Sequence, residues 1–167
     1  ADGWSGFISK TSRLGLVFAM DWKYLDAIEN WLSGGASAAV QWPYLQQEIP
    51  AGGTWKTAYC VYPTHGMESL DGANESAAVG VLVGPGANLD KRVDVSGAKP
   101  GQAVPVKVFV SSPEAGEVEV ALKSRLLPET AAGKEVGKKT VVLKSGEAGK
   151  LEFEYTPAAA GLHVLEV

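Results

Sequence analysis

The sequence predicts an all-β protein made of two β-sandwich modules, and three observations support this prediction. Apolar and polar residues alternate through most of residues 91–167, which is the period of half-buried strands. Gly, Pro and Asn separate these short runs and favour turns. All five Trp, both Met and the Cys lie in the first 67 residues, so the chain has two compositions. We therefore predict domains over residues 1–87 and 88–167, joined near a Gly-Pro-Gly segment.

The first predicted module is a partial large antiparallel sandwich that contains a short helical turn. Its five predicted strands cover residues 4–8, 14–20, 38–49, 54–62 and 77–83. The run over 14–20 is apolar enough to be buried on both faces. Asp21 is placed to cap the helical turn, which extends to residue 32. The strands over 38–49 and 54–62 form a hairpin around a turn at 50–53.

The second predicted module contains six short strands at nearly regular spacing, which is typical of a β-sandwich. These strands cover residues 93–95, 104–110, 118–122, 140–143 and 151–155, and the last begins near residue 162. The segments 93–101, 104–108, 153–157 and 160–162 resemble bacterial immunoglobulin-like or fibronectin-like modules. The resemblance implies a seventh strand, which would lie beyond Val167 or be supplied by a neighbouring chain through β-augmentation.

The first module resembles the C-terminal portion of the galactose mutarotase-like β-sandwich, which polysaccharide lyases and many glycoside-processing proteins share. The resembling segments are residues 15–19, 40–42, 49–55 and 59–63, and they include a P-x-G-x-x-W pattern. The resemblance implies an association with carbohydrate. The catalytic His and carboxylates of that family have no matching positions here, so it implies no catalytic residue.

Composition excludes several classes of function. The net charge of -4 provides no basic surface, so we expect no nucleic-acid partner. No apolar run reaches the roughly 18–20 residues of a membrane span, so none is expected. We also predict no cofactor and no metal site. The start at Ala1 and a strand that stops at Val167 lead us to expect part of a larger secreted, periplasmic or cell-surface protein, with its other domains as partners.

Four aromatic residues are the strongest candidates for binding. Trp42 and Tyr44 point to one face of an extended strand, and Trp55 and Tyr59 share a face of the facing strand. Flat aromatic rings stack on sugars, so these residues are candidates for binding carbohydrate. The alternative is that the same rings fill the core or pack between the modules.

A polar loop supplies a second group of candidates, His65, Glu68, Asp71 and Glu75. Imidazole and carboxylate groups can bind a metal or act as acid and base. The spacing of His65 and Glu68 matches no metal signature, however, because a metalloprotease helix requires a second His one turn away. The alternative is an ordinary solvated loop.

The sequence therefore predicts a non-catalytic structural or accessory module, associated with carbohydrate, whose mechanism is packing and strand pairing. Two alternatives stay open. One is part of a carbohydrate-processing enzyme of the mutarotase-like or lyase class, and the other is a sugar-binding module without turnover.

Overall fold

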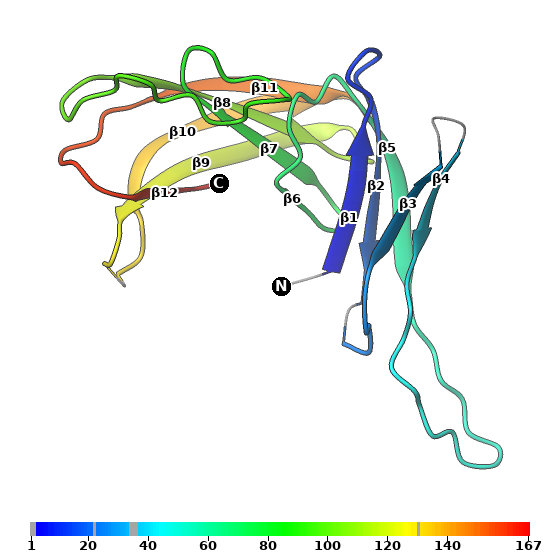
Figure 1. The fold of residues 1–167 in the computed structure, drawn as a ribbon. Coiled ribbons are helices and arrows are strands. Elements are labelled where there is room, and N and C mark those ends of the chain that lie inside the picture. Colours follow the sequence, from blue (N-terminus) through cyan, green and yellow to red (C-terminus); the bar gives the residue numbers. More distant parts are fainter. Residues whose placement is uncertain (1–2, 22, 34–36, 130) are drawn as a thin grey trace.

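The computed structural model describes residues 3–21, 23–33, 37–129 and 131–167. The fold is all-β, and the described residues contain no helix, hence none that could cross a membrane. Within these described residues, twelve strands form four antiparallel sheets (Figure 1). The strands are β1 (Gly3–Ile8), β2 (Leu14–Met20), β3 (Glu29–Ser33), β4 (Ser37–Gln41), β5 (Tyr59–His65), β6 (Gly72–Ala73), β7 (Ala78–Val83), β8 (Val104–Ser111), β9 (Gly116–Leu126), β10 (Lys134–Leu143), β11 (Ala148–Tyr155) and β12 (His163–Glu166).

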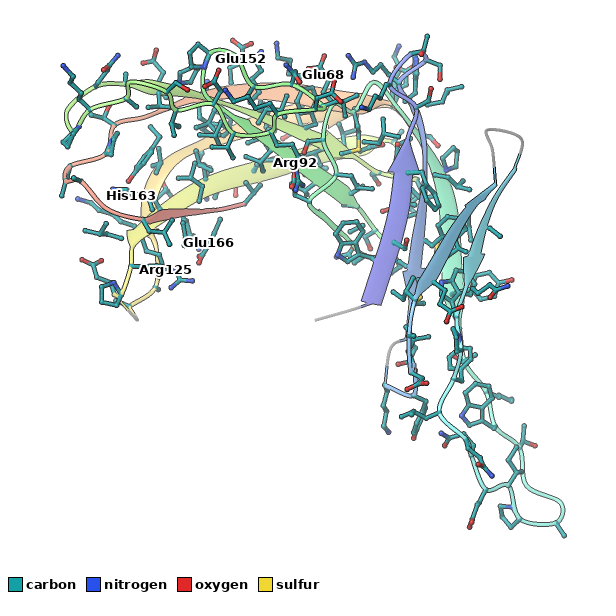
Figure 2. The ribbon with its side chains drawn as sticks, viewed as in Figure 1. Glu68, Arg92, Arg125, Glu152, His163 and Glu166 are labelled. Carbon is teal, nitrogen blue, oxygen red and sulfur yellow. The ribbon has the colours of Figure 1, made fainter. Side chains whose placement is uncertain are left out.

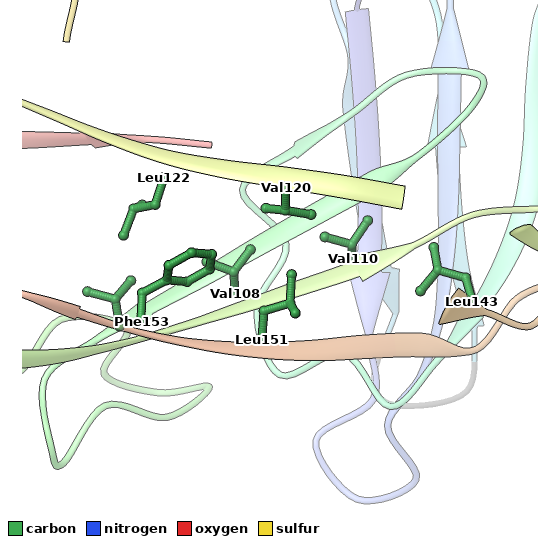
Figure 3. Packing of buried hydrophobic residues seen from close by; sticks show 8 residues of the cluster. Val108, Val110, Val120, Leu122, Leu143, Leu151 and Phe153 are labelled. Atoms are coloured by element: carbon green, nitrogen blue, oxygen red, sulfur yellow. The ribbon is translucent and has the colours of Figure 1, made fainter. Parts of the chain in front are cut away.

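Two sheets, built mainly from the C-terminal half of the chain but including β6 and β7, pack face to face around the larger core. One sheet has the strand order β11-β8-β7-β6 and the other has the order β10-β9-β12. The alternating apolar residues of these strands point inward, as the period of two requires. Eight buried residues form the core between the sheets (Figure 3): Val106, Val108, Val110, Val120, Leu122, Leu143, Leu151 and Phe153.

The sheet that contains β7 and β8 is buried on its other face as well. Ala78 and Leu82 of β7 and Phe109 of β8 belong to a second core, together with Val17 of β2 and Tyr62 of β5. This second core attaches the N-terminal sheet, of order β1-β2-β5, to the C-terminal half. Figure 1 shows the N-terminal sheet standing at the end of the C-terminal sheets. One sheet therefore contributes side chains to both hydrophobic cores.

The segment between the two predicted domains is a tight turn inside a paired region. β7 pairs with β8 along its whole length, from Ala78 opposite Ser111 to Val83 opposite Val106, so the predicted boundary lies between two strands of one sheet. The turn leaves β7 at Gly84, whose φ is 103°. A Cβ there would lie 1.6 Å from the carbonyl oxygen of Asp94. Only glycine fits this close approach.

The predicted helical turn near residues 21–32 is wrong. Leu25 forms an isolated antiparallel bridge with Tyr44, and the strand β3 follows at Glu29. The Asp21 carboxylate accepts a hydrogen bond from the backbone N–H of Lys23 at 3.1 Å, which is the contact of an Asx turn, and no helix follows it among the described residues. Pairing with a distant segment replaces the local helical hydrogen bonds.

The long hairpin predicted over residues 38–62 is largely irregular chain. β4 ends at Gln41 and pairs with β3, whereas β5 begins at Tyr59 and pairs with β2. Pro43 follows shortly after β4 and has no N–H to donate to a ladder, which accounts for the early end of the strand. The predicted turn at 50–53 is present, at the tip of an arm that extends away from the sheets (Figure 1).

The strand β2 has the predicted bounds but is not buried on both faces. Val17 belongs to the second core, and Ala19 on the same face is buried. On the other face Leu14 and Leu16 are 57% and 39% exposed, and the face is buried only at Met20. Apolar composition alone did not reveal this difference, because an outward face can also be apolar.

Candidate functional site

The four candidate aromatic residues form two separate pairs. The ring centroids of Trp42 and Tyr59 are 5.0 Å apart, and those of Tyr44 and Trp55 are 5.1 Å apart. Trp42 also contacts Phe18 of β2, with the centroids 5.7 Å apart. The irregular segment before β5 thus folds back on the outer face of the N-terminal sheet.

The rings of one pair meet edge to face, and those of the other pair are tilted against each other. The interplanar angle is 73° between Tyr44 and Trp55 and 46° between Trp42 and Tyr59. Edge-to-face geometry is the usual way in which aromatic side chains pack against one another. Tyr59 is the exposed member, with 61% of its surface accessible, and Trp42 and Trp55 are half-buried. The arrangement fills space beneath the arm and presents one ring to solvent.

The polar-loop candidates are distributed rather than convergent. His65 is exposed at the end of β5, where its backbone N–H donates to the carbonyl oxygen of Gly146 at 2.7 Å. The hydrogen bond with Glu152 is the main cause of the raised pKa of Lys150, to which Glu68 adds. Burial is the main cause of the raised pKa of Tyr62, to which Glu75 adds. Within the described part of the chain, no three His, Cys, Asp or Glu side chains gather where they could hold a metal ion.

Asp71 has a structural environment. One carboxylate oxygen accepts a hydrogen bond from the backbone N–H of Val81 at 2.7 Å and another from the Ser69 hydroxyl. The other oxygen forms an ion pair with Arg92. The backbone N–H of Asp71 donates to the carbonyl oxygen of Val79 at 2.8 Å. Asp71 directly precedes β6, and its carboxylate accepts a backbone hydrogen bond of β7 at a position that β6 does not reach.

A cavity of about 650 Å³ opens at the edge of the two facing sheets. Its walls are mainly apolar, and it lies between β7 and β12, where the sheet of β10, β9 and β12 has its last strand. Its lining includes Val81, Val83, Arg92, Lys99, His163 and Leu165. Apolar cavities with a few polar groups are the usual form of a binding site.

The imidazole of His163 is fixed in the wall of this cavity. Its Nε2 lies 2.9 Å from the carbonyl oxygen of Ala159, and its Nδ1 lies 2.6 Å from the Tyr155 hydroxyl. A carbonyl can only accept, so Nε2 carries the proton and, in the neutral ring, Nδ1 accepts from Tyr155. At the outer side of β12, Glu166 pairs with Arg125, with Nε and Oε1 2.8 Å apart (Figure 2).

Sequence reasoning missed the cavity, although it expected an unfinished sheet near the end of the chain. The lining residues come from four separate stretches, near residues 71, 81–83, 92–104 and 155–165. These stretches come together only because of the order in which the strands pair. That order cannot be predicted from the spacing of residues within any one stretch. In comparisons with known proteins, no family model, curated protein or solved structure matches this chain.

Proposed function

We propose that this chain is a non-catalytic structural module of a larger secreted or cell-surface protein, and that it holds neighbouring parts of that protein in a fixed orientation. The observation that carries the proposal is the sheet shared by the two cores. Val108 of β8 packs in the larger core, and the adjacent Phe109 packs against the N-terminal sheet. Displacing either half would expose apolar surface, at about 25 cal/mol per Å².

The order of the strands supports an immunoglobulin-like or fibronectin-like arrangement in the C-terminal half. β7, β8 and β11 are adjacent in one sheet, and β9 lies between β10 and β12 in the other. Modules of this type place their first, second and fifth strands in one sheet and their third and sixth strands in the facing sheet. They commonly serve as spacers between other domains, and the proposed role is of this kind.

The test compares the unfolding of the two halves. Trp fluorescence reports on the N-terminal half, because all five Trp lie in the first 67 residues. Amide hydrogen exchange in β9, β10 and β11 reports on the C-terminal half. A rigid body predicts one denaturant midpoint for both probes. Two separate midpoints would contradict the proposal, because the halves would then unfold independently.

Sugar binding is a second candidate, favoured by the exposed ring of Tyr59 beside Trp42. Calorimetric titration with soluble polysaccharides tests it. We expect Tyr59→Ala and Trp42→Ala to abolish binding, and Tyr44→Ala to retain it because Tyr44 belongs to the other aromatic pair. If none of the polysaccharides releases heat, or if all three variants bind like the parent, this candidate is rejected.

A further inference from the structure

The peptide bond between Asp71 and Gly72 joins the two residue types between which an aspartate isomerises with least steric hindrance. Gly72 has no Cβ, so its backbone nitrogen can approach Cγ of Asp71. The Asp71 side chain is 31% exposed, so water reaches it. Asp2-Gly3 is the only other Asp-Gly pair in the sequence, and Asp2 lies outside the described residues. Among the described residues, Asp71 is therefore the aspartate most open to this chemistry.

The isomerisation proceeds through a five-membered succinimide ring. The Gly72 nitrogen attacks Cγ of Asp71, so an N–Cγ bond forms and a Cγ–O bond breaks. The amide proton, one carboxyl oxygen and a proton from solvent leave together as water. A second water molecule then opens the ring. Opening at Cγ restores aspartate, whereas opening at the backbone carbonyl leaves the chain linked through Cγ as isoaspartate, with no net change in mass.

The contacts of the folded chain oppose the first step, because they occupy both oxygens of the Asp71 carboxylate. One oxygen accepts from the backbone N–H of Val81 at 2.7 Å and from the Ser69 hydroxyl. The other oxygen forms an ion pair with Arg92. An oxygen must give up such bonds before it can leave as water, and bonds between charged groups are the stronger kind. The fold therefore protects a bond that is reactive in the unfolded chain.

Arg92 is the donor that can leave most easily. The Val81 N–H belongs to β7, and Ser69 is 1% exposed, so neither can move without opening the hairpin. The Arg92 side chain is 55% exposed, and an exposed ion pair is only weakly held. Arg92 is placed beside Asp71 by its own backbone, whose carbonyl oxygen accepts from the N–H of Val83 at 2.9 Å. A loop that follows β7 thus supplies the removable part of the protection.

We propose that Asp71–Gly72 is a site of spontaneous isoaspartate formation and that the Arg92 ion pair controls how fast isoaspartate forms there. The product has one additional carbon in the backbone before Gly72, and its carboxylate is attached to Cα. Val81 and Arg92 then lose their acceptor, and the pairing of Gly72 with Val79 is displaced. The modification would therefore uncover the edge of β7. It requires only Asp71, Gly72 and water, so it is independent of the proposed structural role.

The test measures isoaspartate at residue 71 in the full chain, incubated either folded or in urea. Heavy-oxygen water labels each ring opening, and electron-based fragmentation in the mass spectrometer distinguishes isoaspartate from aspartate. We expect the folded parent to react at least about tenfold more slowly than the chain in urea, because the donors raise the barrier. Arg92→Ala should react about tenfold faster than the parent when folded, and at the same rate as the parent in urea.

Three variants isolate the cause. Lys91→Ala removes a positive charge from the same loop, but Lys91 pairs with Asp94 at 2.9 Å, so this variant should react like the parent. Gly72→Ala hinders the attacking nitrogen, and its Cβ would have no neighbour within 4 Å. Added to Arg92→Ala, it should abolish the acceleration. Ser69→Ala removes an uncharged donor and should accelerate the reaction even if Arg92→Ala does not fold.

The proposal is overturned if the folded parent reacts as fast as the chain in urea, or if folded Arg92→Ala reacts no faster than the parent. Equal acceleration by Lys91→Ala would assign the effect to the charge of the loop and would also overturn it. Acceleration that persists when Gly72 is alanine would show that the Gly72 nitrogen is not the attacking group. None of these outcomes bears on the two-probe unfolding result, which tests whether the two halves unfold together.

Discussion

The Asp71 carboxylate accepts a hydrogen bond from the backbone N–H of Val81 at 2.7 Å and so performs the role of a neighbouring strand. β6 is only two residues long. The side chain of Asp71, the residue before β6, pairs with the part of β7 that β6 does not reach. A residue that the sequence singled out for acid-base or metal chemistry has its hydrogen-bonding capacity committed to the edge of a sheet.

Removal of this carboxylate is expected to destabilise the fold. Asp71→Ala leaves the N–H of Val81 and the guanidinium of Arg92 without their partner, and the loss of such a partner costs about 1–3 kcal/mol. Asp90→Ala is the matched control, because Asp90 forms an ion pair with Lys10 in which both side chains are about 70% exposed. The control should cost less than about 1 kcal/mol. Urea unfolding measures both, and equal losses would show that the Asp71 contact has no special weight.

Substitution of Gly84 is expected to be far more costly than substitution of Gly97. Both have positive φ, 103° and 77°, so an alanine at either position suffers backbone strain of about 1–2 kcal/mol. A Cβ at Gly84 also meets the backbone of Asp94 at 1.6 Å, whereas a Cβ at Gly97 meets nothing within 4 Å. Thermal unfolding should therefore show a large drop for Gly84→Ala and a small one for Gly97→Ala. Similar drops would mean that the turn can shift to accept a side chain.

The sheet of β11, β8, β7 and β6 contributes side chains to both cores, so we expect substitution of Phe109 to lower the free energy of unfolding strongly. Phe109 is 3% exposed, and truncating a buried aromatic residue to alanine costs about 3–5 kcal/mol. Phe109→Ala should lower the midpoints of Trp fluorescence and of amide exchange together. Val142→Ala, at a residue that is 75% exposed, should change neither by more than about 0.5 kcal/mol. A variant in which only one probe shifts would argue against coupling of the halves.

Stability at high pH should depend on Tyr62. Burial raises the pKa of its phenol above the ordinary value of 10.0, and Cys60 and Glu75 raise it further. The neutral phenol is thus favoured in the folded state, so its contribution is complete below pH 10 and is lost as the pH rises above that value. Its hydroxyl also donates to the carbonyl oxygen of Asn74 at 2.9 Å.

Phenolate absorbance against pH measures this effect. Of the five Tyr, one should resist ionisation until the protein unfolds, and Tyr62→Phe should remove that delayed step. Ionisation of all five near pH 10 in the folded protein would contradict the assignment.

The strands that the sequence predicted well are those whose alternation coincides with burial. Val106, Val108 and Val110 alternate in β8 and all lie in one core, so the pattern and the structure agree. β7 was also located, because its residues are apolar on both faces and both faces are covered. The local sequence pattern is sufficient to predict a strand where its apolar residues are the buried ones.

The irregular arm and the turn after β2 could not be predicted in the same way. Trp42, Tyr44 and Trp55 favour strands, but Pro43 stops the ladder, and the N–H of Leu45 donates to the carbonyl oxygen of Tyr24 instead. The cavity was missed for a related reason, since its walls meet only after β7 and β12 have taken their places in different sheets. Contacts between distant residues decide these features.

The pairing of β7 with β8 limits how this chain can be divided or recombined. The Gly-rich turn after Val83 has the composition of a linker, yet a gene fragment that began at residue 88 would leave β8 paired with β11 alone and would remove β7 from its other edge, from Val106 to Ser111. In such a product the edge of β8 and the apolar residues that β7 covers would be exposed, and the product would be prone to aggregate. A recombination event that exchanged the C-terminal half would therefore have to carry β7 with it. The segment that can be exchanged as a unit is therefore determined by the hydrogen bonds between β7 and β8 and not by the change in amino-acid composition.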